Sequence, residues 1–119
     1  MRAVADAGWE TLRGSIEADV RRVSERLRSL SLARLSAGPA EASHALAQAL
    51  ADAVVRLEAG QGAPAVRRVP RLADLASGDQ VAVLGHDLLA ALDAAPVTEA
   101  SHAVAAEVTE QLAALRRSL

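Results

Sequence analysis

The stretch "WETLRGSIEADVRRVSERLRSL", residues 9–30, carries a regular pattern of apolar residues. They recur at steps of three and four, which places them on one face of an α-helix. Arginine and glutamate occupy many of the positions between them, so the stretch predicts a long amphipathic helix over residues 4–35. Gly8 and Gly14 each cost about 1 kcal/mol relative to alanine, so we expect the turns before Ser15 to fray. The apolar stripe consists of Trp9, Leu12, Ile16, Val20, Val23, Leu27 and Leu30.

Two further helices are predicted from stripes of the same kind. Residues 40–59 carry one of them, and the preceding "SAGPAE", residues 36–41, supplies a stop and a restart. Gly38 suits the end of a helix, and Pro39 suits the first turn of the next, where its missing N–H is no loss. Residues 98–117 carry the other stripe, with Thr98 as the candidate N-cap.

The segment 78–93 is ambiguous. Its first part, "DQVAVLG" at residues 79–85, could form a short β-strand that stops at Gly85. We favour a helix, because Ser77 and Gln80 have the spacing of a capping box and the apolar residues that follow keep helical spacing. The connection before it, residues 60–77, contains glycine and proline and is predicted to be partly extended.

The two halves of the chain resemble each other. Sliding the sequence by 58 positions lays "EASHA" at residues 41–45 on the same five letters at 99–103, and aligns apolar positions in both halves. Each half then reads as two helices joined by a short turn, which predicts antiparallel αα-hairpins over residues 4–59 and 78–117. We expect one all-α domain, residues 1–119, in which the hairpins form a four-helix bundle that closes within the chain or is completed by dimerisation. A true duplication is left open, because alanine-rich helices also align by accident.

The composition excludes several classes of site. There is no cysteine, which excludes disulfides, thiolate metal sites and a cysteine nucleophile. No run of about 18 apolar residues is free of charge, and the N-terminus lacks the apolar core of a signal peptide, so we expect a cytoplasmic protein with no membrane partner. Residues 20–34 hold five arginines against one glutamate, whereas residues 72–110 hold seven acids and no arginine. Such opposed fields can orient helix packing or a partner, although solvated helix faces also explain them.

The repeated motif raises the question of metal binding. In ferritin-like di-metal bundles, helices supply Glu-x-x-His, because residues three apart reach one ion from the same face. The chain is similar to this pattern in Glu41 with His44 and in Glu99 with His102, and antiparallel hairpins would bring both pairs to the same end of the bundle. Both pairs, however, lie in the first turn of a helix, where an acid is favoured without any metal.

We therefore favour a helix start that the chain uses twice. In this interpretation Ala42 and Ala45 face the core and both motif histidines are partly exposed. The alternative is a metal site that uses all four residues of the two pairs.

The remaining candidates are an aromatic residue and a basic patch. Trp9, the only aromatic residue, caps the end of the bundle if it is buried and anchors an interface if it is exposed. Four arginines of the first helix could contact nucleic-acid phosphates, but residues 40–59 and 98–117 carry alanine and acids where a recognition helix needs base-reading side chains. His86 and Asp87 are adjacent and point about 100° apart on a helix, so they do not form an orienting pair. The four arginines are Arg21, Arg22, Arg26 and Arg28.

The sequence carries no Gly-rich phosphate loop, nucleophile elbow or zinc signature. We expect no catalytic residue and no cofactor. The function that fits is a non-catalytic helical interaction module that self-associates or binds a protein partner, with alanine-rich faces that permit close helix approach. A metal-binding bundle is the first alternative, and a nucleic-acid-associated regulator is the second.

Overall fold

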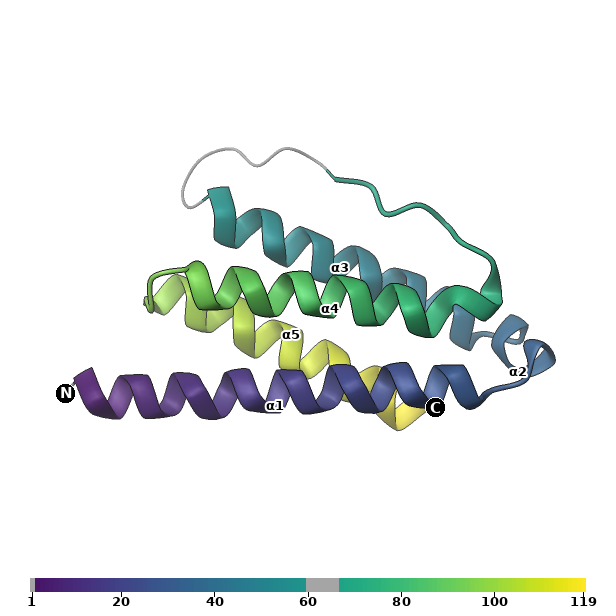
Figure 1. The fold of residues 1–119 in the computed structure, drawn as a ribbon, viewed down its shortest axis with the longest axis horizontal. Helices are drawn as coiled ribbons and strands as arrows, with labels where there is room; N and C mark the ends of the chain where they lie inside the picture. Colours follow the sequence, from purple (N-terminus) through teal and green to yellow (C-terminus); the bar gives the residue numbers. More distant parts are fainter. Residues whose placement is uncertain (1, 60–66) are drawn as a thin grey trace.

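The computed structural model describes residues 2–59 and 67–119, with side chains from residue 8 onward, and its regular structure is entirely helical in these ranges. The predicted all-α class is therefore confirmed, and the ambiguous residues 79–85 are helical (Figure 1). No helix in the described ranges is both long enough and apolar enough to cross a membrane. The elements are α1 (Arg2–Ser29), α2 (Leu32–Ser36), α3 (Pro39–Ala59), a 3₁₀ helix (Asp74–Ala76), α4 (Ser77–Ala94) and α5 (Glu99–Ser118).

Each long helix packs mainly against helices of the other predicted hairpin. Both α1 and α3 lie against α4 and α5, so α1 and α3 are not each other's main neighbours. α1 and α3 run in opposite directions, as do α4 and α5, but α3 and α4 both begin at the end where α2 lies (Figure 1). The helices of the first predicted hairpin thus lie on those of the second rather than mainly on each other. An apolar stripe shows which face of a helix is buried and not which helix covers it.

The predicted first helix, residues 4–35, is divided in two. α1 ends at Ser29, and the extended residue Ser31 caps α2 by accepting a hydrogen bond from the Arg34 N–H (3.2 Å). The break allows Leu30 and Leu35 both to enter the core. The predicted stripe ends at Leu30, and Leu35 lies five residues further on, so a continuous helix would not place both leucines on the same line of the stripe.

The start of α1 also differs from the prediction. α1 begins at Arg2 rather than at residue 4 and continues through Gly8 and Gly14 without a break. Burial of Trp9 in these turns offsets the cost of the two glycines. The predicted restart is confirmed: Gly38 has a positive φ of 150°, and Pro39 is the first residue of α3.

The two predicted caps have different outcomes. Thr98 caps α5 as expected, and its hydroxyl accepts a hydrogen bond from the N–H three residues on (3.1 Å). Ser77 is not an N-cap, because a 3₁₀ helix precedes α4 and the Ser77 hydroxyl donates to the Asp74 carbonyl (2.6 Å). Gln80 turns away from the helix end and donates to the Pro70 carbonyl (2.8 Å).

The core is made by the apolar stripes of the four long helices. The α1 stripe is buried as predicted, except that Leu12 is partly exposed. Because nearly all of these side chains are aliphatic, the helices approach closely. The largest fully buried members are Ile16, Val23, Leu27, Leu35, Leu50, Val81, Leu88, Leu92, Val108 and Leu112.

α1 and α4 approach each other closely, and two glycines permit it. A β-carbon at Gly78 would lie 2.7 Å from the Ser24 carbonyl oxygen, and one at Gly85 would lie 2.8 Å from Cγ2 of Val20. Glycine therefore lets α4 rest directly on α1. Gly85, considered above as the end of a strand, lies in the middle of a helix because its missing side chain is needed for packing.

Ion pairs flank this contact on both sides. Arg13 binds both carboxylate oxygens of Asp93 (2.6 and 3.0 Å), and these hydrogen bonds raise the pKa of the guanidinium above its ordinary value. At the other end of α1, Arg28 donates to Asp79 (2.8 Å). Arginines of the early part of the chain thus face aspartates of the late part, as the uneven charge distribution allowed.

Candidate functional site

The two Glu-x-x-His pairs lie at opposite ends of the molecule. α3 begins at the end where α2 lies and α5 begins at the other end, so the expectation that the pairs meet is wrong (Figure 1). The His44 ring lies 3.0 Å from the Val69 carbonyl, whereas the His102 ring stands edge-on to Trp9 with ring centroids 5.0 Å apart. Within the described residues, no three histidine, aspartate or glutamate side chains are grouped so that they could hold a metal ion.

Each motif histidine is used in packing. His102 packs against the ring of Trp9. Trp9 is 6% exposed, so of the two placements considered above it has the buried one. The prediction that Ala42 and Ala45 face the core is wrong: both are exposed, and Ser43 between them is buried. An alanine-rich helix carries little information about its own phase, because alanine is accepted on either face.

The predicted basic patch of α1 is largely engaged within the chain. Arg22 pairs with the buried Asp19 (3.2 Å), and Arg28 pairs with Asp79. Arg26 donates to the backbone carbonyl of Leu119 (3.1 Å), which ties the end of α5 to α1. Of the four arginines, only Arg21 has a side chain without a hydrogen-bond or ion-pair partner among the described residues. A free basic face for phosphates is thus reduced to one side chain.

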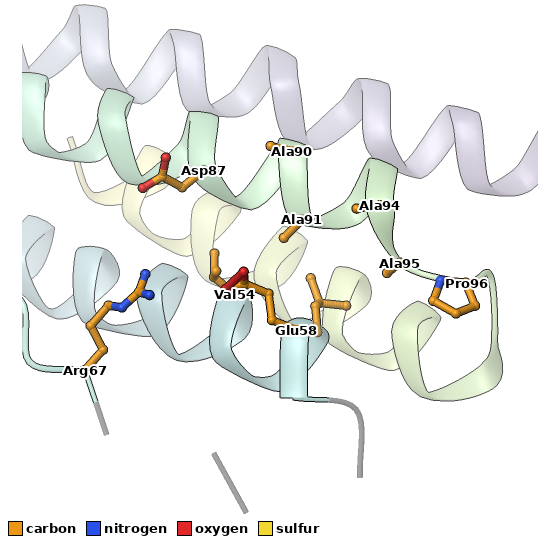
Figure 2. A pocket seen from close by; sticks show the side chains of 10 residues that line it. Val54, Glu58, Arg67, Asp87, Ala90, Ala91, Ala94, Ala95 and Pro96 are labelled. Carbon is orange, nitrogen blue, oxygen red and sulfur yellow. The ribbon is translucent and has the colours of Figure 1, made fainter. Parts of the chain in front are cut away.

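A cleft of about 720 Å³ lies between the C-terminal halves of α3 and α4 (Figure 2). Alanines of α4 form one side, and Glu58, Arg67 and Asp87 bring charged groups to it. Its described lining residues include no serine, threonine, histidine or cysteine. His86 lines a different pocket, against α1, so it does not act with its neighbour Asp87 in this cleft.

The extended segment 67–73 is bound along α3 and α4 by side chains. The Gln48 amide donates to the Arg67 carbonyl (2.7 Å) and accepts from the Val69 N–H (2.9 Å). The His44 ring is hydrogen-bonded to the Val69 carbonyl, and the Gln80 amide donates to the Pro70 carbonyl. Side chains of α3 and α4 thus bind four backbone groups of this segment: the carbonyls of Arg67, Val69 and Pro70 and the N–H of Val69.

The Val69 side chain completes this attachment. It is buried against Ala47 and Ala51 of α3, with Leu84 of α4 beside it. One signal for this contact was overlooked: His44 and Gln48 are four residues apart, so they form a polar pair on one face of α3.

An apolar groove lies between this segment and α4, and we call it the α4 groove. Its volume is about 320 Å³. Leu72 and Val83 line it and are 44% and 62% exposed, and nearby Leu75 is 63% exposed. Neither the Arg67 nor the Arg68 guanidinium has a hydrogen-bond or ion-pair partner among the described residues. The groove is lined by Arg67, Arg68, Val69, Pro70, Leu72, Asp79, Gln80, Val83 and Leu84.

A second apolar groove lies between α3 and α5, and we call it the α3–α5 groove. Its volume is about 420 Å³. The exposed alanines of the first motif are part of its wall, and the buried Leu46 and Leu115 lie beneath it. It is lined by Ala42, Ala45, Leu46, Ala49, Gln111, Ala114, Leu115 and Ser118.

Comparison with family models, curated proteins and solved structures found no match to this chain. Its function is therefore argued from its own residues and geometry.

Proposed function

We propose that this chain is a non-catalytic helical interaction module that binds another polypeptide chain at the α4 groove. The observation that carries this proposal is where the exposed apolar side chains lie. Three of the five large apolar side chains exposed in the described residues, Leu72, Leu75 and Val83, belong to the stretch that forms or adjoins this groove. Single exposed leucines need no explanation, but a cluster beside a groove marks an interaction site.

The α4 groove is also held in shape before any partner arrives. Four hydrogen bonds from His44, Gln48 and Gln80 fix the segment 67–73, and the buried Val69 anchors it. A preformed groove lowers the entropy that binding must offset. Burial of Val83 and Leu72 by a partner contributes about 1–2 kcal/mol each at roughly 25 cal/mol per Å² of apolar surface.

The character of the larger cleft favours binding over catalysis. Its described lining offers charged groups and alanine methyls, without a hydroxyl or an imidazole to act as nucleophile or base. The two motif histidines are likewise engaged within the chain, His44 with the Val69 carbonyl and His102 with the ring of Trp9. An interaction module accounts for an exposed apolar groove that a catalytic role leaves unexplained.

Site-specific photo-crosslinking tests this proposal. A photoreactive residue at position 83 should give covalent adducts in cells that produce the protein. The same residue at Val97, which is 41% exposed and outside the groove, is the matched control. Adducts that form no better from position 83 than from position 97 would contradict the proposal.

A further inference from the structure

We infer that the chain which occupies the α4 groove is a second copy of this one, docked about a two-fold axis that passes close to Val83. Because it names the partner of the same groove, this inference rests on the proposed function. The arrangement behind it is a groove with two arginines at one end, both without partners among the described residues, and with Asp79 at the other end.

The order of charges follows from how the segment 67–73 lies on α4. Gln80, in the first turns of α4, holds the Pro70 carbonyl, whereas Arg67 lines both the α4 groove and the cleft that contains Asp87. The segment therefore runs antiparallel to α4. Its arginines lie towards the C-terminal half of the helix, and Asp79 lies in the first turn. The groove is positive at one end and negative at the other.

A two-fold rotation exchanges the two ends of such a groove. In an isologous contact, residue i of one copy meets residue j of the other, and j meets i. Rotation about an axis near Val83 sets Arg67 and Arg68 of each copy against Asp79 of the other, and sets the apolar middles on each other. Opposite charges meet at both ends of the groove. This orientation is therefore favoured over one in which the like-charged ends of the two copies meet.

Asp79 can accept this additional contact. Its Oδ1 already accepts from Nε of Arg28 (2.8 Å), but its side chain is 71% exposed. A carboxylate has lone pairs on both oxygens, so a guanidinium of the second copy can approach the other one.

The α3–α5 groove is the competing surface for a second copy. Among the described residues that line it, Leu46 and Leu115 are already buried, and the exposed members are small or polar. Dimerisation there removes less large apolar surface from water than dimerisation at the α4 groove does.

Sedimentation of the full chain from tens to hundreds of micromolar tests the inference. The parent chain should show a reversible monomer–dimer equilibrium. R67E/R68E makes both ends of the groove acidic, and D79R makes both ends basic, so each should weaken the dimer about tenfold or more. An equimolar mixture of the two variants should dimerise, because their grooves are complementary. R21E/R34E, the same charge change at exposed arginines outside the groove, should leave the dimer unchanged.

Several results would overturn the inference. One is a chain that stays monomeric over the whole range; another is a dimer broken by Ala45→Glu in the α3–α5 groove rather than by Val83→Glu. Failure of the mixture to dimerise, with both variants folded by circular dichroism, would also overturn it. The mass of the adduct at position 83 separates the two proposals: twice the chain supports the second copy, and any other mass contradicts it while the interaction module stands.

Discussion

Replacing Gly85 by alanine tests the close packing of α4 on α1. The added β-carbon would lie 2.8 Å from Cγ2 of Val20, and closer still to Cγ1, whereas carbon atoms pack at about 3.5–4.0 Å. Val20 is buried and β-branched, so it has little freedom to turn away. One helix must move to relieve the overlap, and overpacking of this kind costs about 1–3 kcal/mol.

Gly14→Ala is the matched control on the partner helix. Nothing lies within 4 Å of a β-carbon at Gly14, so only helix propensity changes and alanine gains about 1 kcal/mol. Gly85→Ala receives the same gain and loses it to the overlap. We therefore expect Gly85→Ala to have a free energy of unfolding about 1–3 kcal/mol below that of Gly14→Ala.

Urea denaturation followed by circular dichroism measures these differences. The overlap itself is isolated by a double-mutant cycle with Val20→Ala, which removes the two methyl groups that Gly85→Ala would strike. We expect a coupling free energy of about 1 kcal/mol or more between the two positions. If Gly85→Ala stabilises the chain as much as Gly14→Ala does, the close packing of α4 on α1 is refuted.

Three further predictions concern the bound segment, a surface carboxylate and the motif histidines. Gln48→Ala leaves the Val69 N–H without its partner, so we expect a loss of about 1–2 kcal/mol in the free energy of unfolding and faster hydrogen exchange at that amide. Unchanged exchange would show that Gln48 does not hold the Val69 amide. The Ser36 hydroxyl donates to Asp74 (2.7 Å) and holds the pKa of that carboxyl below its ordinary value. The ionised Asp74 therefore stabilises the fold at pH values above its ordinary pKa, and this stabilisation is lost as the pH falls through the lowered pKa. Ser36→Ala should raise that pKa in an NMR titration, and an unchanged titration would show that the hydroxyl has no part. Added iron, manganese or zinc should leave the melting temperature unchanged, because the motif pairs lie at opposite ends; a metal-dependent rise that vanishes when either motif histidine is replaced would restore the metal site.

The sequence predicted the helices well wherever large apolar residues set their phase. The α1 stripe from Trp9 to Leu30 is buried as expected except at Leu12, and Thr98 and Pro39 mark helix starts. Where alanine dominates, the prediction failed, as at Ala42, because burying or exposing a methyl group changes the free energy little.

Helix pairing could not be read from the pattern. The stripes predict which face of each helix is buried, whereas the structure shows that α1 rests on α4 and α5. Gly78 and Gly85 are the residues that select this partner, and their meaning depends on Val20 and Ser24, more than fifty residues earlier in the chain. Local signals do not carry such information.

The candidate site escaped prediction for the same reason. Val83 looked like one more apolar residue of α4, and only the packing of the helix shows that it faces outward. The stretch "VRRVPR", residues 66–71, is basic. The place of Arg67 and Arg68 beside an apolar groove depends on Gln48 and His44 holding the segment, which the sequence does not show.

The most direct test of binding at the α4 groove is a dilution series of the isotopically labelled chain followed by NMR. Backbone amide shifts of Val69, Leu72 and Val83 should move with concentration along one saturable curve, while those of Ala45 and Ala114 in the α3–α5 groove stay fixed. Shifts that are independent of concentration, or that move in the α3–α5 groove instead, would contradict the account.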